Sequence, residues 1–354
     1  MTDSTIARLR LSAQKMMSSS FTKPEEVVGW LGAVQAQDFF GSLWVIGQRM
    51  KSAIEADVEQ AIADRKIVRT WPMRGTLHFV LPEDVRWMLK LLTPRVFARA
   101  ATNYRKAGLD NKIFVKSAKL IERALKNGEL LTRDEFYEVL EQGKISTKDT
   151  RGLHISGYLA MQGVICLGPR KGKQPTFTLL DQWISESKVL SLDESLAELA
   201  TRYFRSHGPA TLIDFVWWSG LAVKDAARAL DLVKSKFVSE AIDDQVYWMS
   251  NNLVLPKNNS NQTSLIPAYD EFLVGYKDRS ASVNSTVEAK VRNSIFSPAI
   301  INNGQVIGTW KRTIQKKDVS IEVIPYTKLS AVQQNTIAKE AERYSRFIGL
   351  PLES

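Results

Sequence analysis

The chain has 354 residues, 44% of them hydrophobic, which is enough to bury the cores of two or three domains. Its 48 Lys and Arg against 38 Asp and Glu give a net charge of +10, which favours a polyanionic partner; a basic chain without a specialised partner is the alternative. The single Cys excludes an intrachain disulfide and a Cys-based metal site. The three His are widely separated and leave few candidates for a Ser-His-Asp triad.

Three long amphipathic helices are predicted, each followed by a shorter helix with a capping signal. The long helices are Ser4–Met16, Asn111–Lys126 and Leu192–Ser206, and the shorter helices that follow them start at Thr22, Thr132 and Thr211, in that order. Glu25 and Glu135 lie three residues after the first two starts, which is the spacing of a capping box. The third start has the shorter Asp214 and is a weaker signal.

A β-hairpin is predicted after each set of helices. The strand pairs are Ile67–Thr70 with Thr76–Val80, Gly163–Leu167 with Thr176–Leu180, and Phe237–Ile242 with Val246–Met249, joined by turns at 72–75, 168–172 and 243–244. Helix, turn, helix, helix and hairpin is the order of a winged-helix module. The predicted class is mostly α with β-hairpin wings (α+β), as three tandem winged-helix modules at 1–105, 106–188 and 189–354.

The last module is predicted to carry a C-terminal β and helix extension. A polar loop or linker at 256–264 precedes it. A β-run from Pro298 to Pro325 then turns at Asn303-Gly304, a typical hairpin dipeptide. The final helix begins at Ser330 with a capping box, ends near Gly349, and is expected to pack against the third module.

Two glutamines flank Ala36, at the expected end of the second helix of the first module. On an ideal helix, residues two apart point about 200° apart, so Gln35 and Gln37 share a face only if the helix ends or distorts near Ala36. Each amide offers an oxygen acceptor and an NH₂ donor. The alternative is that one amide caps the helix end and the other is solvated.

Seven runs together resemble the winged-helix DNA glycosylases of the azinomycin-resistance type. Those enzymes carry a Gln–apolar–Gln motif, and a sister branch that unhooks crosslinks has Gln–apolar–Asp. The matching runs span nearly the whole chain and are Val34–Asp38, Arg74–His78, His207–Thr211, Trp217–Leu221, Pro267–Leu273, Gly275–Arg279 and Gly304–Trp310.

The resemblance implies tandem winged helices around a concave basic channel, and hydrolysis of the N-glycosidic bond of cationic alkylated purines in DNA repair. N7-alkylguanine is the first expected substrate, with 3-alkyladenine and interstrand crosslinks left open. The family needs no metal or organic cofactor. An N7-alkylated guanine already carries positive charge, so two amides that hold a water against C1′ suffice. A monofunctional mechanism is predicted because no Lys lies in the glutamine motif.

The predicted catalytic residues are Gln35 and Gln37, with Asp38 and His78 as candidate support. Asp38 has the alternative role of capping the next helix, and His78 that of a strand-edge pair with Arg74. The predicted DNA contacts are Trp71 and Arg74 on the first hairpin, Arg170, Lys171 and Lys173 at the second hairpin tip, Lys277 and Arg279, and Lys311 and Arg312 on the late hairpin. Core packing is the alternative for Trp71, and a solvated turn is the alternative for the second tip. Trp217 falls in a predicted helix among apolar residues and is expected in the core.

The expected partner is double-stranded DNA with alkylated bases, bound by a monomer. No apolar stretch approaches the length of a membrane span and the N-terminus lacks an apolar signal core, so a cytoplasmic, nucleoid-associated protein is expected. A non-catalytic winged-helix DNA-binding or regulatory protein is the competing interpretation, and base excision separates the two. A small-molecule hydrolase is disfavoured, because no nucleophile elbow, phosphate loop or metal-ligand spacing is found.

Overall fold

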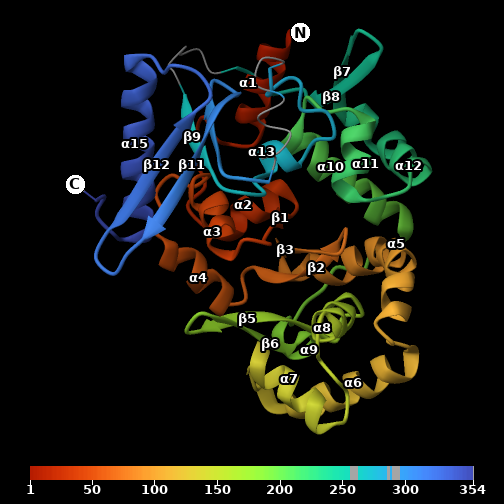
Figure 1. Ribbon diagram of the computed structural model, residues 1–354. Coiled ribbons are helices and arrows are strands. Elements are labelled where there is room, and N and C mark those ends of the chain that lie inside the picture. The colour runs from red at the N-terminus through yellow and green to blue at the C-terminus, as the bar shows by residue number, and fades with distance from the viewer. Residues whose placement is uncertain (256–261, 285–287, 289–295, 354) are drawn as a thin grey trace. The chain divides into compact units, whose positions relative to one another are not determined.

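The computed structural model describes residues 1–255, 262–284, 288 and 296–353, and its elements fall into two compact units (Figure 1). Unit 1 comprises Met1–Val58 and Leu196–Ser354, and unit 2 comprises Glu59–Ser195. The predicted polar loop at 256–264 lies mostly outside the described residues, and its last two residues open a strand. Helices and small antiparallel sheets make up both units, which confirms the predicted α+β class.

Unit 2 is built on two hairpins that pair with each other. Its strands lie in the order β3-β2-β5-β6-β4, and Arg69 of β2 is opposite Leu167 of β5. The strands are β2 (Val68–Met73), β3 (Thr76–Val80), β4 (Leu131–Thr132), β5 (Ile165–Lys171) and β6 (Gln174–Leu179). Both predicted hairpins are confirmed. The second runs further than expected, because a register shift between Gly168 and Lys171 lets the strand pass Pro169 and turn only at residues 172–173.

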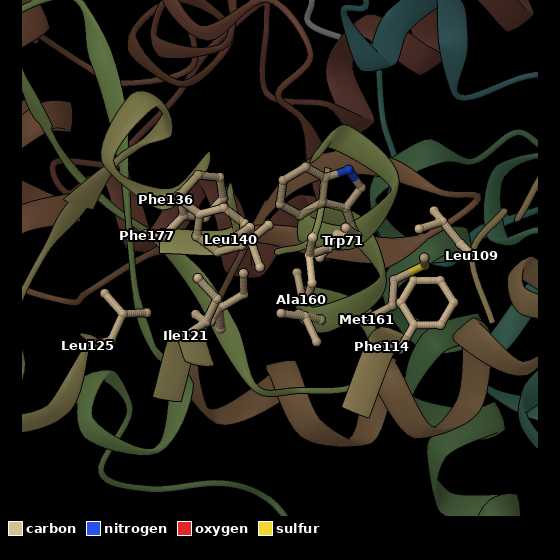
Figure 2. Close-up of a cluster of buried hydrophobic side chains, with 14 of the residues drawn as sticks. Trp71, Leu109, Phe114, Ile121, Leu125, Phe136, Leu140, Ala160, Met161 and Phe177 are labelled. Carbon is tan, nitrogen blue, oxygen red and sulfur yellow. The ribbon is translucent and has the colours of Figure 1, made fainter. Parts of the chain in front are cut away.

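Helices pack against this sheet and close the core of unit 2 (Figure 2). They are α5 (Val85–Lys106), α6 (Asn111–Ala124), α7 (Arg133–Gln142), α8 (Arg151–Met161) and the short α9 (Leu180–Trp183), while α4 (Glu55–Ala63) begins in unit 1. The core is rich in aromatic rings: Phe136 and Phe177 lie 4.6 Å apart, and Phe114 stacks on Tyr158 at 3.6 Å. The predicted capping box of α7 is confirmed, since the Thr132 hydroxyl accepts from the Glu135 N–H.

Unit 1 combines helices from both ends of the chain with two further sheets. The helices are α1 (Asp3–Ala13), α2 (Pro24–Leu31), α3 (Phe39–Gly47), α10 (Leu192–His207), which begins in unit 2, α11 (Leu212–Ser219), α12 (Val223–Val233), α13 (Glu271–Val274) and α15 (Ala331–Ile348). One sheet is the predicted hairpin of β7 (Phe237–Ile242) and β8 (Gln245–Ser250). The other has the order β12-β11-β10-β9, from β9 (Thr263–Ile266), β10 (Ala299–Asn302), β11 (Gln305–Ile314) and β12 (Val319–Pro325). The Asn303-Gly304 turn joins β10 to β11, with positive φ at both residues.

Two further capping predictions are confirmed and one is wrong. Thr211 with Asp214 caps α11, and Ser330 with Gln333 caps α15. At α2 the cap residue is Lys23, not Thr22. There the Glu26 carboxylate, not that of Glu25, accepts the backbone N–H groups of Thr22 and Lys23 at 2.8 and 3.0 Å. The Pro24 ring sets the first helical φ, which moves the start by one residue.

The C-terminal helix α15 packs on α3 as well as on the late sheet (Figure 1). Trp44 of α3 meets Tyr344 and Phe347 at ring distances of 5.3 and 5.0 Å, and Trp310 of β11 meets Tyr344 at 5.3 Å. The expected packing of α15 on the late part of the chain is found, and its contact with α3 is an addition to it. Residues more than 290 positions apart share this core, which local sequence patterns do not reveal.

We predict that Gly47→Ala lowers the free energy of unfolding by about 1–3 kcal/mol, the usual cost of overpacking a core. A Cβ at Gly47 would overlap the ring of Phe347, which is buried. Urea denaturation measures the loss. The double variant Gly47→Ala with Phe347→Leu opens space for the new methyl group and should show less than the sum of the two single losses; additive losses would contradict the packing argument.

Candidate active site

The glutamine motif lies in an extended connection between two helices of unit 1. Helix α2 ends at Leu31, and Gly32 follows with a φ of 83°, which a glycine adopts without strain. Val34 and Gln35 then form the short strand β1, and α3 begins after Asp38. The prediction that the motif sits at the end of a helix is wrong, because Gly32 stops that helix earlier. The backbone is extended at Val34 and Gln35 and bends at Gln37 and Asp38, so helical periodicity does not set the directions of the two side chains.

The two amides differ in exposure. Gln35 is 7% exposed, whereas Gln37 is exposed at the surface of unit 1. The backbone N–H of Gln35 donates to the Oε1 atom of Glu271 at 3.0 Å. Gln35 is therefore held from inside the unit, while Gln37 is presented outward.

Glu271 is a fully buried carboxylate at the start of α13. Besides Gln35, the indole N–H of Trp218 donates to its Oε2 atom at 3.0 Å, and Nε2 of His207 lies 3.4 Å from the same oxygen. The His207 ring stacks on Tyr203, with centroids 4.8 Å apart. Burial lowers the pKa of His207, and the Glu271 carboxylate opposes that shift.

The neighbouring carboxylate, Asp270, ties α13 to the helix on the other side of the glutamine motif. Arg49, just after α3, is fully buried and donates to Asp270 Oδ1 and Oδ2 at 2.8 and 2.9 Å. The Gln48 amide donates to the same carboxylate at 2.8 Å, and Arg49 also donates to the Gln14 side chain at 2.8 Å. Glu271 therefore holds β1, and Asp270 holds the end of α3.

Asp270 and Glu271 are candidate site residues that the sequence alone does not predict. The run Pro267–Leu273 supplies both carboxylates. Two adjacent acids inside a largely apolar run are the signal that could have indicated buried, partnered groups.

Asp38 caps α3 and pairs with the late hairpin. Its Oδ1 atom accepts from the Gly41 N–H at 3.1 Å, which confirms the capping alternative. Arg312 lies 3.5 Å from Asp38 Oδ2 and donates to the Tyr344 hydroxyl at 2.8 Å, with 19% of its side chain exposed. Arg312 has internal partners and is not proposed as a DNA contact. Lys311 is exposed, at 4.0 Å from Glu322.

A patch of two cations and one indole lies at the end of α11 and just after α13. Trp217 is 38% exposed, and the Lys277 Nζ and Arg279 Cζ atoms lie 5.0 and 5.4 Å from its ring centroid. Trp217 donates to the Val274 carbonyl at 3.0 Å, and Arg279 to the Leu273 carbonyl at 2.7 Å. Lys277 is exposed. Trp217, expected in the core, is therefore at the surface beside both predicted phosphate contacts.

In unit 2, Arg74 and His78 form the strand pair that is the alternative to site roles for both residues. The Arg74 guanidinium lies 3.1 Å from His78 Nε2, and His78 Nδ1 lies 2.9 Å from the Thr76 carbonyl. Because Arg74 can only donate, Nε2 is the acceptor and Nδ1 carries the proton. His78 is fully buried, and Arg74 lies at the turn with a φ of 57°.

Trp71 lies in the core of unit 2, where Figure 2 shows its ring facing buried side chains from several helices. It is 8% exposed, so the prediction of a groove contact is wrong and the core alternative holds. At the second hairpin, Arg170 donates to Glu59 at 2.7 Å and Lys171 to the Leu130 carbonyl at 2.9 Å. Lys173 is exposed at the tip and is the better candidate there for a phosphate.

Among the residues that the structure describes, no three His, Cys, Asp or Glu side chains gather as a metal site. None of the helices in this described part of the chain is both long and apolar enough to cross a membrane.

The chain is basic and is built of helices and small antiparallel sheets, and its amide motif has one glutamine at the surface and one buried. The family model described as "DNA glycosylase AlkZ-like" matches residues 28–347, so the chain belongs to the AlkZ-like family of DNA glycosylases. It is 24% identical to an interstrand DNA cross-link repair glycosylase of Streptomyces sahachiroi, over 96% of this chain and 95% of the relative. The solved structure of the Streptomyces sahachiroi DNA glycosylase AlkZ matches with a TM-score of 0.77 and 22% identity, over 100% of this chain and 99% of that one. This likeness supports a winged-helix type of architecture, while the borders of the three modules remain a prediction.

Proposed function

We propose that the protein hydrolyses the N-glycosidic bond of cationic alkylated purines in DNA, with N7-alkylguanine as the first substrate. Gln35 and Gln37 hold the attacking water, and their carbonyl dipoles favour the positive charge that develops on the sugar. One observation carries the proposal. The motif lies in the connection between α2 and α3, where Gln37 is exposed at the surface and the backbone of Gln35 is fixed by a buried carboxylate.

The absence of an acid from the motif sets the expected selectivity. Neither amide ionises, so the enzyme gives the departing base little protonic help. A cationic purine leaves readily without that help, whereas an unmodified base does not. The site therefore favours lesions that already carry positive charge.

Interstrand crosslinks are the second candidate substrate. The relative from Streptomyces sahachiroi is named an interstrand DNA cross-link repair glycosylase, and crosslinks formed through N7 of guanine place the same charge on the leaving base. Unhooking such a crosslink requires the same bond cleavage as removal of an N7-methyl lesion.

Base excision from three oligonucleotides tests the proposal: one with N7-methylguanine, one with 3-methyladenine and one with a nitrogen-mustard crosslink. The double variant Gln35→Ala with Gln37→Ala is the matched control. Release of the cationic bases by the wild type and not by the double variant supports the proposal. Tight DNA binding without any base release would instead indicate the non-catalytic DNA-binding protein.

Lys277 is proposed as a phosphate contact, since it is exposed beside Trp217 on unit 1. We predict that Lys277→Gln weakens DNA binding and lowers the slope of log K against log salt by about 0.9, the value for one lost phosphate contact. Binding titrations across a range of salt concentrations measure the slope. Lys316→Gln is the charge-matched control, because Lys316 is an exposed turn residue expected to be solvated. Equal slopes for the two variants would rule out a specific contact at Lys277.

A further inference from the structure

Glu271 lies in the interior of unit 1 and yet touches the glutamine motif. Its side chain is fully buried, and its two oxygens accept from groups on different elements. Oε1 takes the Gln35 N–H of β1 at 3.0 Å, and Oε2 takes the Trp218 N–H of α11 at 3.0 Å. A carboxylate withdrawn from water in this way is costly unless its oxygens are hydrogen-bonded.

The buried charge of Glu271 is not needed to attach α13 to the rest of unit 1. Asp270, the preceding residue, already ties this turn to Arg49 and Gln48 beside α3. At the other end of α13, the Tyr203 hydroxyl donates to the Gly275 carbonyl at 2.9 Å. Glu271 adds a contact of another kind, because it reaches the backbone of β1 inside the glutamine motif.

We propose that Glu271 is a positioning residue for Gln35. The proposal rests on the proposed function, in which the Gln35 amide holds the attacking water. A hydrogen bond from a backbone N–H to an ionised carboxylate is in general stronger than one to a neutral acceptor. The Gln35 backbone is thereby fixed against α13 and α11, and with it the point from which the amide side chain extends. Displacements of about 1 Å at a catalytic group can cost about 100-fold in rate, so such an anchor has a direct kinetic effect.

Three measurements on Glu271→Gln and Glu271→Ala test this role. Single-turnover excision of N7-methylguanine at saturating protein reports the chemical step, and a binding titration with the same oligonucleotide reports affinity. Amide hydrogen exchange over residues 32–38 reports the Gln35 N–H itself, and does so without any reaction.

Glu271→Ala is expected to lower the excision rate by about 10–100-fold, up to the loss that a displacement of about 1 Å at a catalytic group causes. DNA affinity should stay within about twofold of the wild type, because the lost interaction acts on the chemical step. Hydrogen exchange of the Gln35 backbone N–H should be faster than in the wild type. Glu271→Gln keeps the size of the side chain and one acceptor oxygen, so its rate should lie between those of Glu271→Ala and the wild type. If Glu271→Ala does not fold, the excision rate, DNA affinity and hydrogen exchange of Glu271→Gln test the inference.

Tyr203→Phe is the matched control. It removes another buried hydrogen bond of the same short helix and keeps the ring that stacks on His207. The hydroxyl that this variant loses binds the Gly275 carbonyl and not β1. Its excision rate should therefore stay within about twofold of the wild type, and the Gln35 backbone N–H should remain protected from exchange. Equal rate losses in the control and in the Glu271 variants would mean general damage to α13 and would overturn the inference.

The outcomes also separate this inference from the proposed function. If changes at Gln35 and Gln37 lower excision while changes at Glu271 do not, Glu271 is not a positioning residue and the proposed function stands. A parallel loss of rate and affinity in the Glu271 variants would likewise overturn the inference. If neither glutamine matters for excision, the proposed function fails and takes the inference with it, whatever the exchange of the Gln35 amide shows.

Discussion

Gln37→Ala is expected to lower the single-turnover rate of N7-methylguanine excision by about 10²–10³-fold, the scale of losing one positioned polar group. Gln37 is exposed immediately before the cap of α3, so its truncation removes an amide without opening a cavity in the core. Thermal stability should therefore remain close to that of the wild type. The loss should appear in the rate at saturating protein and leave DNA affinity largely unchanged.

Gln35→Ala should reduce excision as well, and the double variant should lose less than the product of the two single effects. Two groups that hold one water act as a unit, and removal of either one already releases the water. Asp38→Asn is the control, because asparagine keeps an oxygen for the Gly41 N–H and removes only the charge that faces Arg312. If excision is unchanged in both single glutamine variants, the motif is not catalytic and the non-catalytic interpretation gains support.

Local signals predicted most of the secondary structure of this chain. A hydroxyl followed three residues later by an acid or amide marked the starts of α7, α11 and α15, because that capping interaction is made within one turn. Runs of β-branched and aromatic residues around turn dipeptides marked the hairpins for the same local reason. Where a neighbouring residue competed, as Pro24 does at α2, the start moved by one position.

The position of the glutamine motif was harder to predict, because its local pattern fits two conformations. The run from Val27 to Phe40 is apolar enough to continue a helix, but the helix ends at Leu31, where Gly32 follows with a positive φ, and a new helix begins after Asp38. The partners of the motif lie beyond any local pattern. Gln35 and Glu271 are 236 positions apart, and Arg49 and Asp270 are 221 apart. Only folding brings such groups together, so their roles emerge from the structure.

Two tryptophans show the same limit. Both Trp71 and Trp217 lie among apolar residues, and the sequence placed the first near DNA and the second in the core. The structure reverses these positions, with Trp71 at 8% and Trp217 at 38% exposure. Neighbouring apolar residues indicate that a segment is buried, but they do not indicate which of its rings lies at the edge of the core.

Arg49→Met is expected to lower the free energy of unfolding by about 3–5 kcal/mol, the usual cost of removing one partner of a buried ion pair. All five N–H groups of Arg49 have acceptors. They donate to the carbonyls of Gln14 and Val45, the Gln14 side chain, and both oxygens of Asp270, at 2.8–3.1 Å. Methionine fills much of the volume but leaves the Asp270 charge buried without its cation. Urea denaturation of the two proteins measures the difference.

The double variant Arg49→Met with Asp270→Asn tests whether the orphaned charge is the cause. Asparagine can still accept the Phe272 N–H that Asp270 caps at 2.8 Å, and it removes the uncompensated charge. The double variant should therefore be more stable than Arg49→Met alone, with a coupling energy of about 1–3 kcal/mol between the two positions. If the two losses simply add, the stability provided by Arg49 comes from packing and from its carbonyl contacts, and the ion pair contributes little. In that case the attachment of α13 beside α3 would not depend on charge, and only Glu271 would remain as a charged anchor behind the glutamine motif.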